Sequence, residues 1–353
     1  MIYLIQFFYF KQQPLLRFMS NVAKLLHNYC NLLLSETSSW AMRKEQLENM
    51  HALFVQLGAL DAYKDQGAAK DRHMPGGKAI APASAAMCLF DIARTRQFVA
   101  AVKQAITDKT KDQTTPVLVL DAGCGPYALL SLLAALYFSP QQVKFRILDI
   151  YETNIQSART LIKALEMEAF FEEMICVNAL EYKWPLQQPP DILLTETMNR
   201  ALTKEPQVAI SLRLAPLLAA SGILIPEKID LELVAVDRKK RNELMTSNTT
   251  GEDLPAALYE HRLAPVLSLL KDSTHAAIGR QPLTRVELPP GFDGHQLELH
   301  TTITVYKQVV LKNNESAVTL PLVLKQQALA GDILEFYYKM TDEPGIETRL
   351  ISP

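Results

Sequence analysis

Between residues 116 and 226, short apolar runs alternate with longer helical segments, and this alternation restricts the possible folds more than any other feature of the chain. The run Val117-Leu-Val-Leu120 is continuously apolar, as a strand buried on both faces requires. Further strands are predicted at residues 144–148, 174–177, 191–195 and 222–226, and helices at 127–138, 153–166 and 206–220. This β-α order predicts an α/β domain with a mainly parallel sheet and right-handed crossovers.

The flanking segments have different patterns. Residues 20–65 and 83–107 have apolar positions at helical spacing, and the breaker cluster Met74-Pro-Gly-Gly-Lys78 indicates a boundary between them. After Pro226, alternating or β-branched runs predict antiparallel strands, at 230–236, 296–300, 302–306 and 333–338. We therefore expect a helical extension (1–75), an α/β domain (76–226) and an all-β, barrel-like domain (227–353) with a helical insertion near 252–271.

Composition excludes some functions. The formal net charge of −2 provides no field that would gather nucleic acid or an anionic membrane. The one basic cluster, Arg238-Lys-Lys-Arg241, is expected in a solvated loop. The apolar start, Met1–Phe10, is too short to span a bilayer, and it is either an extension or the result of an early start codon, with Met19 as the real start.

The cysteines are scattered along the chain, at Cys30, Cys88, Cys124 and Cys176. They form no C-x-x-C pair and have no histidine at ligand spacing, so we expect neither a disulfide framework nor a metal site. This usage favours a reducing, cytoplasmic location. The histidines, His51 among them, are isolated, and structural roles are expected for them.

A glycine motif joins the first predicted strand to the helix after it. In Asp121-Ala-Gly-Cys-Gly125 the glycines allow the backbone to approach a ligand or adopt positive φ. The bulky Pro126-Tyr127 pair stands where a dinucleotide-binding loop needs a small residue beside the pyrophosphate. The motif therefore indicates a Rossmann-like site for a cofactor without phosphates, and S-adenosylmethionine meets that condition.

Two other strand ends supply polar side chains. Asp149 ends the second predicted strand, where a carboxylate can accept hydrogen bonds from both ribose hydroxyls, although it could instead cap the helix that follows. Asn178 and Ala179 follow the third strand, where an adenine edge would lie, and a plain turn is the alternative for Asn178.

Four local patterns occur together: Cys88-Leu-Phe-Asp-Ile-Ala-Arg94-Thr95, Leu120-Asp-Ala-Gly-Cys-Gly125 with Asp149 beyond it, Thr195-Glu-Thr-Met198 with Glu205, and Ala219-Ala-Ser-Gly-Ile-Leu-Ile-Pro226. Together they resemble the protein arginine methyltransferase family of class I S-adenosylmethionine-dependent methyltransferases, from about residue 85 to the C-terminus. The resemblance implies that Arg94 pairs with the carboxylate of the cofactor's methionine end. It also implies that Glu196 and Glu205 are the family's two catalytic glutamates. With the strand-end residues, the candidate cofactor-binding set is Arg94, Asp121, Gly123, Gly125, Asp149, Asn178 and Ala179.

The chemistry of the two acids agrees with this resemblance. A guanidinium stays charged at cellular pH, and carboxylates can bind its planar donors in pairs. Glu196 and Glu205 cannot share one helical face, so they converge only if the chain between them folds back. The alternatives are that Glu196 merely ends a strand and that Glu205 begins a helix before Pro206.

Some positions differ from the family pattern and leave the acceptor open. Thr197, Asn199 and Arg200 replace the family's Trp, Gly and Tyr in the acid loop, and a cationic Arg200 in the pocket would repel a guanidinium or occupy the acids. Thr304-Val-Tyr306 stands for the family's Thr-His-Trp loop, and Ala85 for another histidine.

We therefore predict N-methylation of a guanidino or amino group on a peptide or small molecule. The alternatives are a small-molecule O- or N-methyltransferase with a changed acceptor pocket and an inactive cofactor-binding scaffold. The family forms ring-like dimers in which a helical arm from the barrel packs on the partner. This implies a possible homodimer here, with residues 252–271 as the candidate arm and Leu254, Leu258 and Leu263 as apolar contacts.

Overall fold

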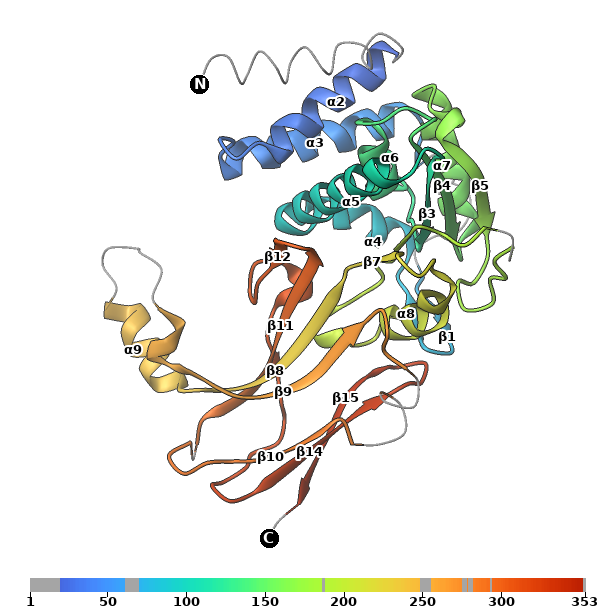
Figure 1. The fold of residues 1–353 in the computed structure, drawn as a ribbon. Coiled ribbons are helices and arrows are strands. Elements are labelled where there is room, and N and C mark those ends of the chain that lie inside the picture. Colours follow the sequence, from blue (N-terminus) through green and yellow to red (C-terminus); the bar gives the residue numbers. More distant parts are fainter. Residues whose placement is uncertain are drawn as a thin grey trace.

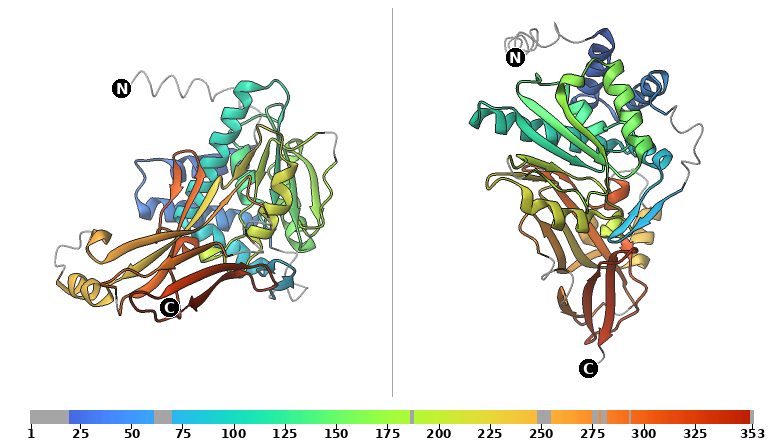
Figure 2. Two further views of the ribbon diagram at one scale, coloured as in Figure 1. Left: turned by 60° about the horizontal axis from the view of Figure 1, so that its bottom comes forward. Right: turned by 90° about the vertical axis from the view of Figure 1, so that its right-hand side faces the viewer.

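The computed structural model describes residues 20–60, 70–185, 188–247, 255–274, 278, 282–292 and 294–351. The apolar segment 1–10 and the alternative start at Met19 lie outside this part of the chain. Helices form one end of the molecule, a parallel sheet lies next to them, and antiparallel strands form the other end (Figure 1). The right-hand view of Figure 2 shows the C-terminal strands farthest from the N-terminal helices.

The N-terminal helices are α2 (Asn21–Leu34) and α3 (Trp40–Gln56), which pack against each other. Ser20 and Ser39 cap them, each accepting a hydrogen bond from a backbone N–H of the first turn. Their apolar positions are buried against α5 and η2, as the helical spacing predicts. No helix in the described part of the chain is long and apolar enough to cross a membrane.

A short strap follows, in which β1 (Arg72–Met74) and β2 (Gly77–Ala79) form an antiparallel hairpin. The predicted breaker cluster supplies its turn, since Gly76 and Gly77 have φ of 91° and 142°. The chain continues through α4 (Pro82–Met87) and η2 (Cys88–Phe90) into α5 (Ile92–Asp112). The helical stretch predicted at 83–107 is therefore confirmed but is divided before α5.

The parallel sheet has the order β5-β4-β3-β6-β7. Its strands are β3 (Val117–Ala122), β4 (Val143–Asp149), β5 (Phe171–Cys176), β6 (Ile192–Leu194) and β7 (Ile223–Ile225). The helices between them are α6 (Leu129–Ala135), α7 (Glu152–Ala164), η3 (Glu168–Phe170), η4 (Arg200–Leu202), α8 (Gln207–Leu214) and η5 (Ala215–Leu217). All pairings are parallel, and the strand order reverses at β3, which places a ligand crevice at its carboxyl end. The predicted Rossmann-like α/β class is confirmed.

The C-terminal region is antiparallel, as predicted. One sheet has the order β12-β11-β8-β9, with β13 also paired to β11, and the other has the order β10-β14-β15. The strands are β8 (Lys228–Val236), β9 (Glu260–Leu270), β10 (Thr284–Glu287), β11 (Gln296–Tyr306), β12 (Val309–Leu311), β13 (Leu322–Val323), β14 (Ile333–Lys339) and β15 (Gly345–Ile351). The division of the chain at residues 75 and 226 remains a proposal.

The helical insertion predicted near 252–271 is wrong. Residues 260–270 form strand β9, whereas η6 (Ala256–Leu258) is a single turn, and residues 252–254 lie outside the described part. The physical reason is the pairing of β8 with β9, whose register shifts twice, between Leu231 and Glu232 and between Leu233 and Val234. Register shifts interrupt the period of two in β9, so its apolar spacing imitates that of a helix.

The helix that interrupts the strands lies earlier, at α9 (Arg238–Ser247), which contains the basic cluster expected in a loop. All its residues are exposed or half-exposed, so it has no apolar stripe by which the sequence could reveal it. Figure 1 shows α9 at the far end of β8 and β9, away from the parallel sheet.

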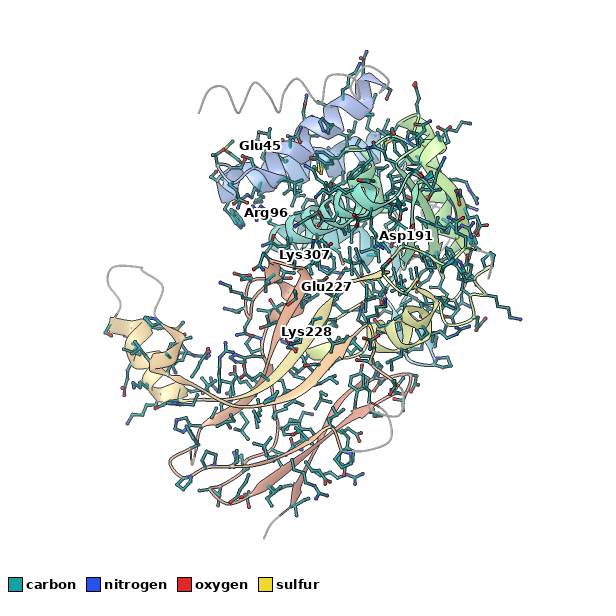
Figure 3. The ribbon with its side chains drawn as sticks, viewed as in Figure 1. Glu45, Arg96, Asp191, Glu227, Lys228 and Lys307 are labelled. Atoms are coloured by element: carbon teal, nitrogen blue, oxygen red, sulfur yellow. The ribbon has the colours of Figure 1, made fainter. Side chains whose placement is uncertain are left out.

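The C-terminal region docks on α5 at both ends of that helix. At the start, Asp91 Oδ2 accepts hydrogen bonds from Ser316 Oγ at 2.7 Å and from the Ala317 N–H at 2.9 Å. Ser316 is the N-cap of η7 (Ala317–Thr319), and Ala317 is its first residue. At the end, Asp108 Oδ2 contacts the Lys307 ammonium at 2.6 Å, and Figure 3 shows Lys307 beside the helix. These contacts hold the two regions together beside the crevice.

Candidate active site

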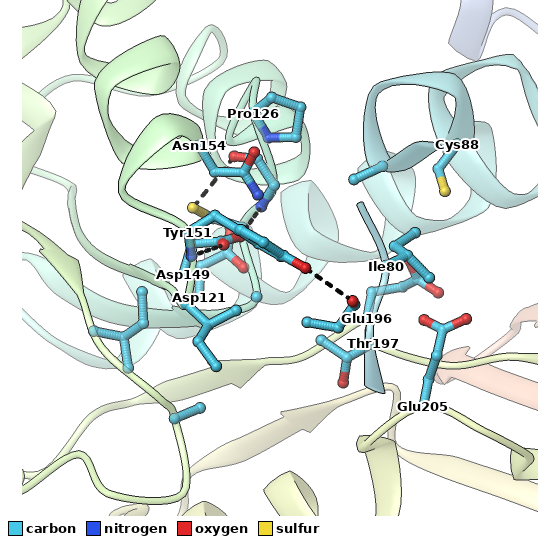
Figure 4. Close-up of a pocket in the computed structure, with 18 of the residues that line it drawn as sticks. Ile80, Cys88, Asp121, Pro126, Asp149, Tyr151, Asn154, Glu196, Thr197 and Glu205 are labelled. Carbon is cyan, nitrogen blue, oxygen red and sulfur yellow. Dashed lines mark hydrogen bonds between the residues drawn. The ribbon is translucent and has the colours of Figure 1, made fainter. Parts of the chain in front are cut away.

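All nine candidate residues line one cavity at the carboxyl edge of the parallel sheet, namely Arg94, Asp121, Gly123, Gly125, Asp149, Asn178, Ala179, Glu196 and Glu205. Figure 4 shows Asp149 and Asp121 on one side of this cavity and Glu196 and Glu205 on the other. The structure therefore brings together residues separated by up to 111 positions of sequence, since Arg94 and Glu205 are both in the lining.

The glycine loop after β3 needs both of its glycines. Gly123 has φ of 91°, and a Cβ there would overlap the Thr197 side chain of the acid loop. Gly125 has φ of 67°, and its N–H donates to Asp149 Oδ2 at 2.9 Å. Gly123 is thus required by close approach as well as by its conformation, and Gly125 by its conformation alone.

Asp149 does not cap the helix that follows it. The N-cap of α7 is Tyr151, and Asp149 Oδ1 accepts a hydrogen bond from the Tyr151 N–H at 2.9 Å. Gly125 and Tyr151 therefore donate to different oxygens of Asp149, and the Asn154 side chain and the Ile150 N–H also donate to this carboxylate. Burial raises the pKa of Asp149 and is opposed by these hydrogen bonds. This geometry favours the ribose interpretation over the cap.

Asp121 and Asn178 line the cavity, but each side chain is engaged elsewhere. Asp121 Oδ2 accepts a hydrogen bond from Ser131 Oγ of α6 at 2.6 Å, and burial raises the pKa of Asp121 to about 7. Asn178 Oδ1 accepts from the Leu180 N–H at 3.1 Å, and its amide donates to Glu181 Oε1 at 3.2 Å. Asn178 is therefore a turn residue as well as a cavity residue.

The chain between the two acids folds back as their convergence requires. Ala201, Leu202 and Lys204 have left-handed φ of 50°, 55° and 67°. A left-handed non-glycine residue costs roughly 1–2 kcal/mol, so the fold must hold this loop. Tyr338 of β14 does so in part, because its hydroxyl donates to the Leu202 carbonyl at 2.7 Å. The Thr197 N–H donates to Gln207 Oε1 at 2.9 Å.

Glu196 forms an ion pair with Arg94 through its Oε2. Within the described part of the chain its other oxygen, Oε1, is buried and has no hydrogen-bond partner. Burial raises the pKa of Glu196 to about 7, although the Arg94 charge opposes that rise. A buried acceptor without a partner costs free energy, so a cationic or N–H donor in the cavity would be bound favourably at Oε1.

Glu205 points to the cavity rather than capping a helix. The N-cap of α8 is Pro206, and Glu205 Oε1 accepts a hydrogen bond from Asn199 Nδ2 at 3.2 Å. Burial raises the pKa of Glu205, while the Arg94 charge and the Asn199 hydrogen bond lower it. Asn199, one of the departures from the family pattern, thus holds the second acid.

The other departures do not obstruct the acids. Arg200 is exposed and lies outside the cavity lining in the described structure, so it neither repels a cation there nor occupies the acids. Tyr306 belongs to the end of β11, and its hydroxyl donates to Asp108 Oδ2 at 3.2 Å. Ala85 does line the cavity.

No model of a known protein family matches the sequence, and a search of curated proteins finds no match either. Solved structures are similar to it. One is PRMT1 of Trypanosoma brucei, in its enzyme–prozyme heterotetrameric complex with AdoHcy, with a TM-score of 0.51 and 17% identity over 75% of this chain and 92% of that one. The chain has the fold of a protein arginine methyltransferase. Protein arginine methyltransferase 10 of Arabidopsis thaliana has a TM-score of 0.47 and 13% identity, over 75% and 96% of the two chains.

In this arginine methyltransferase fold, the cavity has residues that sequence reasoning missed. The strap of β1 and β2 crosses the cavity, where Met74, Lys78, Ala79 and Ile80 line it. Tyr151 holds the strap, because its hydroxyl donates to the Ala79 carbonyl at 3.1 Å. A Cβ on Gly77 would lie 2.7 Å from the Glu205 backbone. The glycine pair was a possible signal, but by itself it indicates only a turn.

Proposed function

We propose that the protein transfers a methyl group from S-adenosylmethionine to a nitrogen of a guanidino or amino group. The observation that carries this proposal is the meeting of Glu196 and Glu205 in the cavity that Asp149 and the glycine loop also line. The unpartnered, buried Oε1 of Glu196 gives that cavity a place for a cationic donor. The fold supports the same chemistry, since the T. brucei structure of this fold is a complex with AdoHcy.

The cavity residues fit the cofactor at both of its ends. Asp149 supplies a carboxylate that would accept from the ribose hydroxyls, and Arg94 supplies a guanidinium for the carboxylate of the methionine end. Gly123 and Gly125 leave room for backbone approach between these two residues. The bound cofactor would supply an electrophilic methyl group on its sulfonium sulfur.

The two acids would hold and orient the acceptor. Carboxylates on two sides of a guanidinium can aim one nitrogen at the methyl group, and such positioning supplies much of the rate. The attacking nitrogen loses a proton when it gains the methyl group. Glu196, whose pKa burial raises to about 7, is suited to accept that proton near neutral pH.

A small-molecule acceptor is the second candidate, and the strap favours it. Lys78 donates its backbone N–H to the Lys204 carbonyl at 2.8 Å, and Gly76 donates to the Thr341 carbonyl at 3.1 Å, so the strap is fastened on the acceptor side. A peptide would have to pass this strap, whereas a metabolite need only enter the cavity. An inactive scaffold is disfavoured by the intact acid pair.

The experiment that tests the proposal is a screen of labelled methyl transfer onto arginine peptides and free metabolites, read by mass spectrometry. Transfer to nitrogen of a guanidino or amino group is the expected result. Transfer to oxygen alone would support the altered-pocket alternative, and binding of the cofactor without transfer to any acceptor would support the scaffold.

Arg94→Ala is expected to weaken binding of S-adenosylhomocysteine about fivefold, close to 1 kcal/mol. The effect is smaller than for an ordinary charge-assisted pair because Arg94 also pairs with Glu196, with which the cofactor carboxylate must compete. Calorimetry measures the affinity, and thermal melting measures the fold. A variant that melts much lower but binds normally when folded would make Arg94 structural only.

A homodimer belongs to the proposal, with α9 in place of residues 252–271 as the arm. The exposed Met245, with 60% of its surface accessible, is the apolar contact that α9 offers. We expect a dimer by light scattering at micromolar concentration, and we expect Met245→Asp to shift it toward monomer. A monomeric wild-type protein at that concentration would contradict this expectation.

The cysteine pattern supports a cytoplasmic location as a further part of the proposal, because the four cysteines are scattered and free. The charge balance likewise favours a peptide or small molecule over nucleic acid or a membrane as partner.

A further inference from the structure

The N-terminal helices contact the cofactor loop through Tyr127. This residue is 2% exposed, and its ring packs on Phe54 of α3 with centroids 4.9 Å apart. Its hydroxyl is hydrogen-bonded to Nδ1 of His51, also of α3, at 3.0 Å. Tyr127, which is too bulky for a dinucleotide-binding loop, therefore also attaches the glycine loop to α3.

This fastening acts on a strained piece of backbone. Ala128, the next residue, has a left-handed φ of 42° and is the N-cap of α6, where it provides no side-chain hydrogen bond. Such a conformation persists only where the surroundings hold it. Leu129 and Leu130, the first residues of α6, line the cavity together with Gly123 and Gly125. The position of Tyr127 therefore fixes the loop on one side and the start of α6 on the other.

His51 also contacts the element that carries Arg94. Its ring lies 5.2 Å from the Phe90 ring, edge to face. Phe90 ends η2 directly before Asp91. The Asp91 side chain accepts a hydrogen bond from the backbone N–H of Arg94 at 3.1 Å. Burial lowers the pKa of His51, so near neutral pH the ring is uncharged and can pair with a neutral hydroxyl.

We propose that His51 is a positioning residue for the cofactor site, which holds the glycine loop through Tyr127 and the start of α5 through Phe90. The N-terminal helices are then part of the cofactor site although they do not line it. This inference rests on the proposed function, because the ligand is the same cofactor.

The test compares variants of the full chain by calorimetry with S-adenosylhomocysteine. His51→Phe keeps a ring but removes the nitrogen, and Tyr127→Phe removes the hydroxyl. Each is expected to weaken binding about fivefold, the effect of one partly buried hydrogen bond. Because both remove the same bond, the double variant should bind no more weakly than either single variant. His51→Asn, which keeps an amide near the Nδ1 position, should restore most of the affinity.

Tyr137→Phe is the matched control. The Tyr137 hydroxyl donates to Asn31 Oδ1 of α2 at 2.8 Å. Tyr137 follows the end of α6, so this bond also joins the N-terminal helices to the α/β domain. Tyr137 is a described residue outside the cavity lining, and its variant should lose stability without losing affinity. Unchanged affinity in His51→Phe, or an equal loss in Tyr137→Phe, would overturn the inference and leave the proposed function intact. A wild-type protein that does not bind the ligand would instead overturn the proposed function itself, and the inference with it.

Discussion

Glu196→Gln is expected to lower the rate of methyl transfer at least about a hundredfold, or about 2.7 kcal/mol of transition-state stabilisation. Glutamine keeps the shape of the side chain and can still accept from Arg94, but it lacks the charge that holds a cationic nitrogen. Cofactor affinity should not fall, because Asp149 and the glycine loop are unchanged and Arg94 no longer pairs with a competing charge. Initial rates on the acceptor that the screen identifies, with calorimetry of cofactor binding, measure the two effects separately.

Glu205→Gln is the companion variant. If both acids hold the acceptor, its rate should fall similarly, whereas little change would limit the role of Glu205 to the fold of its loop.

The wild-type rate should also rise as the pH passes about 7, where Glu196 becomes ionised. Near-normal turnover of Glu196→Gln would end the guanidinium hypothesis and leave a methyltransferase with a differently built acceptor pocket.

Asp149→Ala is expected to weaken binding of S-adenosylmethionine and of its demethylated product at least tenfold, about 1.4 kcal/mol or more. The variant would lose the hydrogen bonds that we propose for the ribose hydroxyls. It also loses the acceptor that the Gly125 N–H uses, so the loop itself is less well held. Calorimetry on the folded variant measures the loss.

Asp149→Asn separates these two contributions. The asparagine oxygen can still accept from Gly125, while the amide donor replaces the oxygen that accepts from the Tyr151 N–H and would face a ribose hydroxyl. An affinity between those of the wild type and Asp149→Ala is therefore expected. Unchanged affinity in Asp149→Ala would remove Asp149 from the cofactor site.

The sequence by itself determines the α/β sheet and its ligand edge. The inner strands β3 and β6, and β7 beside them, are short apolar runs, as burial between covering layers requires. Strands β4 and β5 also carry charged side chains, but they keep the alternation with helices that predicts a parallel sheet. The glycine loop and Asp149 follow directly from the ends of those strands. For this reason these residues of the cavity lining could be predicted one by one.

Only the tertiary structure decides the rest of the site, because it depends on contacts between segments that are distant in sequence. The apolar spacing of β9 can be recognised as that of a strand only when its shifted pairing with β8 is known. The strap reaches the acids through Gly77, and His51 reaches the cofactor loop through Tyr127. Arg94 pairs with Glu196, and Arg200 is exposed outside the cavity lining, by side-chain placement that no local pattern specifies. Local periodicity reports which faces are buried, whereas the partner of a buried charge is set by the packing of the whole chain.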